Sequence, residues 1–171
     1  MVVYLLQQTK YAQTRDDILS GKGARRFGGR WNPVGAALVY SSATPELAHS
    51  ELMIHLKNIP PPTCNFIMIQ VPDESITKLS HESLSQGWRS YQNYRITQKT
   101  TENWLKDKSS LVLQVPSAIV PMSYNFLINP LHIEIEKVNI IRSEPFIFDE
   151  RYNVQPKSDF MAALFDKMQG E

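Results

Sequence analysis

Short apolar runs bounded by turn-forming residues constrain the fold of this chain more strongly than any other feature of its sequence. The runs have the lengths and residue types that are typical of β-strands, and prolines set the ends of several of them. We expect strands over residues 36–41, 65–71, 111–115, 118–120, 138–142 and 146–148. A chain with so many short strands must build its core around a sheet.

Helical periodicity is confined to three stretches, namely residues 45–56, the surroundings of 102–106, and a C-terminal helix within 158–169. The first has a clear beginning, because Thr44 can cap free N–H groups and Pro45 suits the first helical position. Together the elements predict an α+β fold with a mixed, strand-dominated core. Since the chain has 171 residues, we expect a single compact domain over 1–171.

Composition excludes several classes of function. Hydrophobic residues make up 42% of the chain and charged residues 20%, as in ordinary globular proteins. No apolar run approaches the roughly 20 residues of a membrane span, and residues 1–6 are too short and uncharged for a signal peptide. With 18 basic and 17 acidic residues, the net charge of +1 supplies no field for binding nucleic acid directly. We therefore expect a cytoplasmic protein without a membrane or nucleic-acid partner.

The residues that commonly bind metals form no recognisable ligand pattern. Cys64 is the only cysteine, which rules out an internal disulfide and favours a packing role. The histidines lie at positions 49, 55, 81 and 132, without the spacing of a metal site. No glycine-rich phosphate loop of Walker type is present. We predict neither a bound cofactor nor a metal requirement.

An acidic residue interrupts the apolar face of the predicted helix 45–56. At 100° per residue, Leu47, Ala48, Leu52 and Ile54 share one face, and Glu51 falls near its middle. Burying an unpaired carboxylate costs several kcal/mol, so Glu51 needs a partner or must line a cavity. A structural salt bridge, or a side chain that reaches the edge of the face, would also explain the pattern.

A glycine-rich turn, GGRWNPVG over residues 28–35, precedes the predicted strand 36–41 and favours a hairpin. Arg30 could bind phosphate or carboxylate oxygens, although such an arginine is commonly a solvated surface charge. Tyr40 could stack on a flat heterocycle or simply pack. A four-residue turn would pair Arg30 with Ala37 and put Tyr40 on the opposite face, so a shared site requires a bulge or another loop.

A third cluster combines VPSAIVP over residues 115–121 with NFLINP over residues 125–130. Small polar residues interrupt apolar sequence here, and Ser117 and Asn129 could orient a ligand. Serine after proline and asparagine before proline also make local turns, which is the alternative for both residues.

Taken together, these segments resemble the RES family, which is named for an arginine, a glutamate and a serine. The three residues correspond here to Arg30, Glu51 and Ser117. The resemblance covers nearly the whole chain, from SGKGA at residues 20–24, through the segments described above, to FIFD at residues 146–149.

The resemblance implies a fold similar to that of ADP-ribosyltransferase toxins, NAD as substrate, and a cognate Xre-type helix-turn-helix antitoxin. It implies a catalytic group of Arg30, Tyr40 and Glu51. The residues expected to bind substrate are Gly29, Trp31, Ser117 and Asn129. Within this group we expect Arg30 to contact the pyrophosphate and to help keep Glu51 ionised, and Tyr40 to position the nicotinamide.

The function implied is that of a toxin that cleaves the nicotinamide-ribose bond of NAD by hydrolysis or phosphorolysis. A carboxylate beside the ribose would stabilise the cationic transition state. ADP-ribosyl transfer to a protein would share the cation-forming step. An inactive, partner-binding relative is a third reading, because Leu5 and Ser123 depart from the family's commoner residues. The sequence leaves open whether the chain forms a homodimer.

Overall fold

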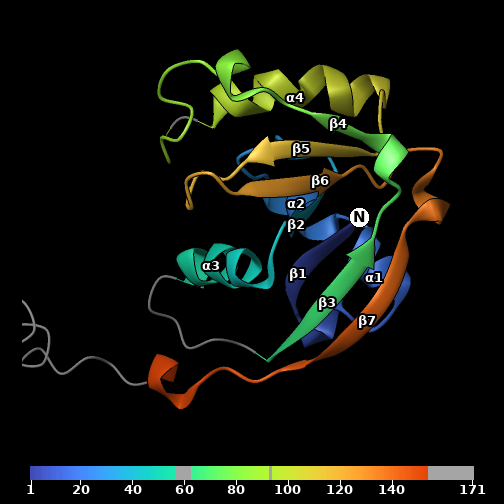
Figure 1. Cartoon of the computed structure of the whole chain (residues 1–171), viewed down its shortest axis with the longest axis vertical. Helices are drawn as coiled ribbons and strands as arrows, with labels where there is room; N and C mark the ends of the chain where they lie inside the picture. Colours follow the sequence, from blue (N-terminus) through green and yellow to red (C-terminus); the bar gives the residue numbers. More distant parts are fainter. Residues whose placement is uncertain (57–62, 93, 154–171) are drawn as a thin grey trace, which may run out of the picture.

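One mixed β-sheet organises the chain (Figure 1). The computed structural model describes residues 1–56, 63–92 and 94–153. Within them, a seven-stranded sheet has the order β4-β5-β6-β2-β1-β3-β7. The strands are β1 (Val2–Gln8), β2 (Val39–Ser42), β3 (Cys64–Gln70), β4 (Ile76–Lys78), β5 (Val112–Pro116), β6 (Tyr124–Ile128) and β7 (Asn139–Phe146). All neighbours are antiparallel except β4 and β5. The predicted α+β fold with a mixed, strand-dominated core is confirmed.

The helices lie around this sheet. The α-helices are α1 (Arg15–Leu19), α2 (Lys22–Phe27), α3 (Pro45–Leu56) and α4 (Arg95–Asp107). Short 3-10 turns are η1 (Thr9–Tyr11), η2 (Asp73–Ser75), η3 (His81–Ser83), η4 (Ile135–Lys137) and η5 (Glu150–Asn153). Helix α4 runs beside β4 and β5, whereas α3 packs against β1 and β2 (Figure 1). In the part of the chain that the structure describes, no helix is both long enough and apolar enough to cross a membrane.

The sheet consists of two well-paired parts joined by a narrow seam. Strands β1 and β3 pair along their whole length, from Val2 opposite Gln70 to Gln8 opposite Cys64. Strands β1 and β2, in contrast, are in register only at Tyr4 and Ser42. Figure 1 shows the β4–β5–β6 part and the β1–β3–β7 part diverging from this seam. The two parts of the sheet are therefore joined through β1 and β2 by a single register pair.

Both faces of the central strands are buried, which explains their nearly continuous apolar sequences. In β5, Val112 packs into one core cluster, and Leu113 packs into another together with Trp104 of α4. Leu127 of β6 joins the cluster of Leu113, whereas Ile128 joins that of Val112. Strands buried on both sides lose the alternation of apolar and polar residues but keep β-branched runs. The predicted strand 111–115 corresponds to β5 for this reason, and the predicted strand 65–71 corresponds to β3.

Several predicted strand ranges are wrong. Residues 118–120 form a bend rather than a strand, because the Ser117 hydroxyl accepts hydrogen bonds from the N–H groups of Ile119 and Val120, both at 3.1 Å. The strand of this region is β6, which was not predicted. The prediction for 146–148 holds only at Phe146, the last residue of β7. Strand β2 begins at Val39, three residues later than the predicted start at 36.

Helix α4 is longer than the predicted 102–106. Its beginning was missed because threonines, rather than apolar residues, lie on its buried face there. Thr97 and Thr101 are both fully buried one turn apart, with Trp104 following them. The two hydroxyls donate hydrogen bonds to the carbonyls of Arg30 and Trp31, each at 2.5 Å. A helix that binds a loop through hydroxyl groups shows little apolar periodicity at its beginning.

Helix α3 begins as predicted. The Thr44 hydroxyl accepts a hydrogen bond from the N–H of Leu47 at 3.2 Å. Leu47 and Ala48 are buried, but Ile54 is 53% exposed, so its assignment to the apolar face is wrong. Cys64 is buried in β3, which confirms its packing role. The predicted helix within 158–169 lies outside the described residues.

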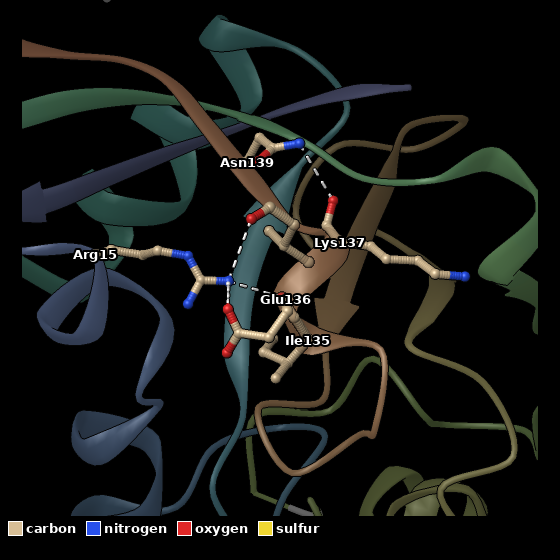
Figure 2. Close-up of polar contacts among 6 residues, drawn as sticks. Arg15, Ile135, Glu136, Lys137 and Asn139 are labelled. Carbon is tan, nitrogen blue, oxygen red and sulfur yellow. Dashed lines mark hydrogen bonds and ion pairs between the residues drawn. The ribbon is translucent and has the colours of Figure 1, made fainter.

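Arg15 fastens α1 to the segment between β6 and β7 (Figure 2). Its Nη2 donates to the carbonyls of Ile135 at 2.9 Å and Val138 at 3.3 Å. The same nitrogen lies 3.3 Å from a carboxylate oxygen of Glu136, whose side chain is 82% exposed. Asn139 closes the turn through a 3.4 Å bond to the Lys137 carbonyl. The arginine thereby satisfies carbonyl groups that lie outside the sheet ladder.

We expect Arg15→Ala to lower the free energy of unfolding by about 1–2 kcal/mol, because two carbonyls lose a charged donor. Glu136→Gln is the matched control, and it should change stability by less than about 0.5 kcal/mol, since an exposed ion pair contributes little. Urea denaturation of both variants measures the difference. Equal effects of the two substitutions would assign the stabilisation to the ion pair instead.

Candidate active site

Glu51 lines a small cavity at the seam of the sheet. The cavity has a volume of about 170 Å³ and lies between α3 and strands β1, β2 and β6. Tyr4 of β1 and Ser42 of β2, the register pair that joins the two parts of the sheet, both line it. Tyr40 and Asn125 line it as well. The inward direction predicted for Glu51 thus leads to a cavity wall.

Two neutral donors hold the Glu51 carboxylate. Its Oε1 accepts hydrogen bonds from Asn125 Nδ2 at 2.5 Å and from Ser117 Oγ at 3.2 Å. Asn125 is oriented by Ser42, whose hydroxyl donates to Asn125 Oδ1 at 2.9 Å. Because that oxygen is occupied, the amide nitrogen of Asn125 must face Glu51.

Ser117 is also oriented, by its own backbone. It is buried, and its oxygen already accepts hydrogen bonds from the N–H groups of Ile119 and Val120. A hydroxyl has one proton and two acceptor sites, so the proton of Ser117 points to Glu51. The bend at residues 118–120, where a strand was predicted, therefore holds the Ser117 hydroxyl in position to donate to Glu51.

The charge of Glu51 has no cationic partner in the described residues. The ion pairs of residues 1–56, 63–92 and 94–153 do not include it. The structural salt bridge considered from the sequence is therefore not observed in them. Hydrogen bonds from neutral groups stabilise a carboxylate without neutralising it. The carboxylate remains available to a positively charged group that enters the cavity.

Tyr40 anchors the glycine-rich turn. Its hydroxyl donates to Asn32 Oδ1 at 2.7 Å and accepts a hydrogen bond from the backbone N–H of Trp31 at 3.0 Å. Burial raises the pKa of the Tyr40 phenol well above its usual value, so the hydroxyl stays protonated at neutral pH. Asn32 is itself fully buried and donates to the carbonyls of Ala24 and Ala36. Tyr40 thus fixes the turn to β2.

Gly29 allows this contact. A Cβ atom at position 29 would lie 2.5 Å from the Tyr40 hydroxyl oxygen, which is closer than real side chains approach. The carbonyl of Gly29 accepts a hydrogen bond from Gln98 Nε2 of α4 at 2.8 Å. Glycine is required here because the tyrosine occupies the space of a side chain.

The predicted hairpin is wrong. Residues 29 and 32 form only an isolated bridge, and β2 pairs with β1 and β6 instead of with a strand containing Arg30. Arg30 is consequently not opposite Ala37. The Tyr40 hydroxyl contacts the turn at Trp31 and Asn32, so Tyr40 and the turn are connected without a β-bulge.

Arg30 is engaged by residues that do not line the Glu51 cavity, namely Trp88, Ser90 and Tyr94. Its Nη1 donates to the carbonyls of Trp88 at 2.8 Å and Ser90 at 3.3 Å. The guanidinium carbon lies 4.7 Å from the centre of the Tyr94 ring. Arg30 does not line the cavity of Glu51.

The other predicted site residues differ in position. Glu51 and Ser117 are in direct contact, Tyr40 shares their cavity, and Gly29 abuts Tyr40. Trp31 is buried in the core beside Trp88 at a ring-centre distance of 5.9 Å. Asn129 is buried in the turn after β6, where its Oδ1 accepts a hydrogen bond from the Leu131 N–H at 3.0 Å. Neither Trp31 nor Asn129 lines the cavity.

Sequence reasoning missed Asn125 and His55 as site residues. Asn125 is a polar residue within an apolar run, an anomaly of the same kind as Glu51, but NFLINP reads as turn chemistry. His55 follows Glu51 by one helical turn and lines the same cavity. Its position in the predicted helix was the available signal, since residues four apart share a face.

A larger cavity adjoins the first. It has a volume of about 450 Å³ and is bounded by β1, α1, α2 and β2. Leu5, Leu6 and Tyr40 line both cavities. Among the residues that the structure describes, no group of three or more histidine, cysteine or acidic side chains could hold a metal ion. The two cavities are adjacent, with Leu5, Leu6 and Tyr40 between them.

We expect Tyr40→Phe to lower the free energy of unfolding by about 1–3 kcal/mol, because the buried Trp31 N–H and Asn32 Oδ1 lose their partner. Tyr124→Phe is the control, since Tyr124 is 43% exposed, and it should cost less than about 0.5 kcal/mol. Chemical denaturation followed by tryptophan fluorescence measures both. A Tyr40→Phe variant as stable as the control would show that the hydroxyl does not hold the turn.

Comparison with known proteins places this chain in a family. The RES domain model matches residues 2–149. The "Prs ADP-ribosylating toxin" of Sphingobium sp. is 34% identical over 139 residues, covering 79% of this chain and 86% of the relative. Proteins named "Toxin Res" are 35% identical in Pseudomonas putida, over 78% of this chain and 91% of the relative, and 30% identical in Photorhabdus laumondii, over 88% and 96%. The chain belongs to the RES domain family.

Proposed function

We propose that this protein cleaves the bond between nicotinamide and ribose in NAD. The observation that carries the proposal is the Glu51 carboxylate, which lines a cavity and is held by Asn125 and Ser117 without a cationic partner among the described residues. Such a group is suited to stabilising a positive charge that develops on a bound sugar.

The chemistry of NAD requires little more than this stabilisation. The nicotinamide of NAD is cationic, and it leaves as a neutral molecule when the electron pair of the C–N bond moves to its ring nitrogen. The ribose carbon then carries oxocarbenium character, as in glycoside hydrolysis. An attacking water adds to that carbon and loses a proton. Because the leaving group needs no protonation, one ionised carboxylate is sufficient in principle.

Tyr40 contributes as a wall of the site and as a support. Its ring borders the cavity of Glu51, while its hydroxyl is fully engaged with Asn32 and the Trp31 N–H. We assign to it the positioning of the nicotinamide ribose, because a ring fixed at its far end presents a rigid surface.

Glu51→Gln tests the function most directly. Glutamine retains an oxygen that can accept hydrogen bonds from Asn125 and Ser117, so the fold and NAD binding should persist. Loss of the negative charge should lower kcat for NAD by about 100-fold or more. Purified protein incubated with NAD, with nicotinamide release measured by chromatography, gives the rate.

Glu102→Gln is the matched control, because Glu102 is an exposed carboxylate on α4 that lines neither cavity. It should leave kcat within about twofold, as surface substitutions away from a site generally do. Undiminished nicotinamide release by Glu51→Gln, or no release by the unaltered protein, would refute the proposal.

The product of the reaction identifies the group that accepts the sugar. Hydrolysis yields ADP-ribose, whereas phosphorolysis yields a phosphorylated ADP-ribose and a rate that rises with inorganic phosphate. Mass spectrometry of the reaction with and without phosphate separates these two outcomes.

Transfer of ADP-ribose to a protein is a second candidate, favoured by the name of the Sphingobium relative, an ADP-ribosylating toxin. It would use the same carboxylate and replace water with a nucleophilic side chain. Incubation of the protein with NAD and a cell extract, followed by mass spectrometry, would reveal ADP-ribosylated proteins in this case.

We propose that the chain acts as a toxin with a cognate antitoxin. The relatives named "Toxin Res" support this role. The family resemblance further suggests that the antitoxin is of the Xre helix-turn-helix type and that the toxin acts in the cytoplasm, where NAD is abundant. Induced expression should halt bacterial growth, and Glu51→Gln should abolish that effect.

A further inference from the structure

The cavity of about 450 Å³ beside the Glu51 site has the size of an ordinary small-molecule site. The Glu51 cavity, at about 170 Å³, is smaller than such sites commonly are. Leu5, Leu6 and Tyr40 form a wall that the two cavities share. Because the two cavities share these lining residues, we expect a ligand whose reacting sugar lies beside Glu51 to extend into the larger space.

Positive charge lines the larger cavity from α2. Lys22 and Arg26 lie four residues apart on this helix, and both line the cavity. In the described part of the chain, neither side chain is within 4.0 Å of a carboxylate oxygen. The acidic residue of the lining, Asp17, accepts a hydrogen bond from the Thr14 N–H in the capping box of α1. The lining therefore carries an excess of positive charge.

The beginning of α2 is fixed against the sheet. Gly21 precedes the helix with a φ of 60°, and a Cβ atom there would lie 2.6 Å from the backbone nitrogen of Leu38. This close approach requires glycine at position 21. It also fixes the position of the first residue of α2, Lys22. The packing of the backbone thus determines where the Lys22 main chain lies beside the cavity.

Aromatic side chains border the same cavity. Tyr11 and Phe27 both line it and are 55% and 74% exposed, respectively. Exposed rings beside a cavity can stack on a planar heterocycle. Cations next to such rings suit a ligand that joins phosphate groups to a base.

We infer that the larger cavity binds the nucleoside diphosphate half of the substrate, with Lys22 and Arg26 contacting its pyrophosphate. The inference rests on the proposed function for its orientation, since the sugar at Glu51 decides which half extends across Leu5 and Tyr40. It places the pyrophosphate at Lys22 and Arg26 and away from Arg30, whose guanidinium binds the carbonyls of Trp88 and Ser90.

ADP is the probe that tests this site without requiring catalysis. Titration calorimetry should detect ADP binding to the unaltered protein, and the affinity should fall as salt is raised. The double variant Lys22→Ala/Arg26→Ala should bind ADP about 10-fold more weakly or worse, because charged hydrogen bonds to phosphate are lost. Arg25→Ala is the matched control, as Arg25 is exposed on the same helix but does not line the cavity.

A charge introduced at Gly23 provides a second test that leaves both cations in place. Gly23 lines the cavity, and a Cβ atom there would meet no protein atom within 4 Å. Gly23→Glu should weaken ADP binding through repulsion of the phosphates, whereas Gly23→Gln, equal in size and neutral, should weaken it less. This pair separates charge from bulk.

With NAD as substrate, Lys22→Ala/Arg26→Ala should raise KM about 10-fold or more and change kcat much less than Glu51→Gln does. The inference would be overturned if the unaltered protein does not bind ADP. It would also be overturned if the double variant and Arg25→Ala bind ADP equally strongly, even if NAD is cleaved. If ADP binding depends on Lys22 and Arg26 but the protein leaves NAD intact, the nucleotide site would be supported and the proposed reaction rejected.

Discussion

The hydrogen bonds that Asn125 and Ser117 donate to Glu51 are the interaction on which the site depends. They connect a helix, a strand and a bend, so the carboxylate is held by parts of the chain that only the complete fold brings together. Neutral donors keep the carboxylate in place without cancelling its charge. A cationic partner in the same place would have made Glu51 a structural residue, and the cavity beside it would have little chemical use.

The second constraint is the seam between β1 and β2. Tyr4 and Ser42 are the only register pair of these two strands, and both line the cavity of Glu51. Tyr40 lines the same cavity and, through its hydroxyl, ties the glycine-rich turn to the sheet. The glycine-rich turn is itself bound by hydrogen bonds from α4. Helix α4 therefore supports the site through the turn, although it does not line the cavity of Glu51.

The sequence predicted best what burial determines alone. Strand β5, which is covered on both faces, was recognisable as an apolar run, and Glu51 was recognisable as a costly residue on an apolar face. Strand β6 is also covered on both faces but was not predicted, because its sequence resembles a turn. What depends on pairing could not be predicted: the contact of Asn125 with Glu51 follows from the neighbouring positions of β6 and β2. The beginning of α4 was missed because Thr97 and Thr101 bind carbonyls, which leaves no apolar stripe. The engagement of Arg30 likewise depends on a loop far away in sequence.

The single register pair at the seam has a mechanical consequence. The β1–β3–β7 ribbon and the β4–β5–β6–β2 ribbon are each held by longer ladders, although the β3–β7 ladder shifts register between Met68 and Ile69. We therefore expect bending between the ribbons to concentrate where the ladder is shortest, at Tyr4 and Ser42. A small rotation there would change the spacing of the residues that line the Glu51 cavity while leaving both ribbons intact.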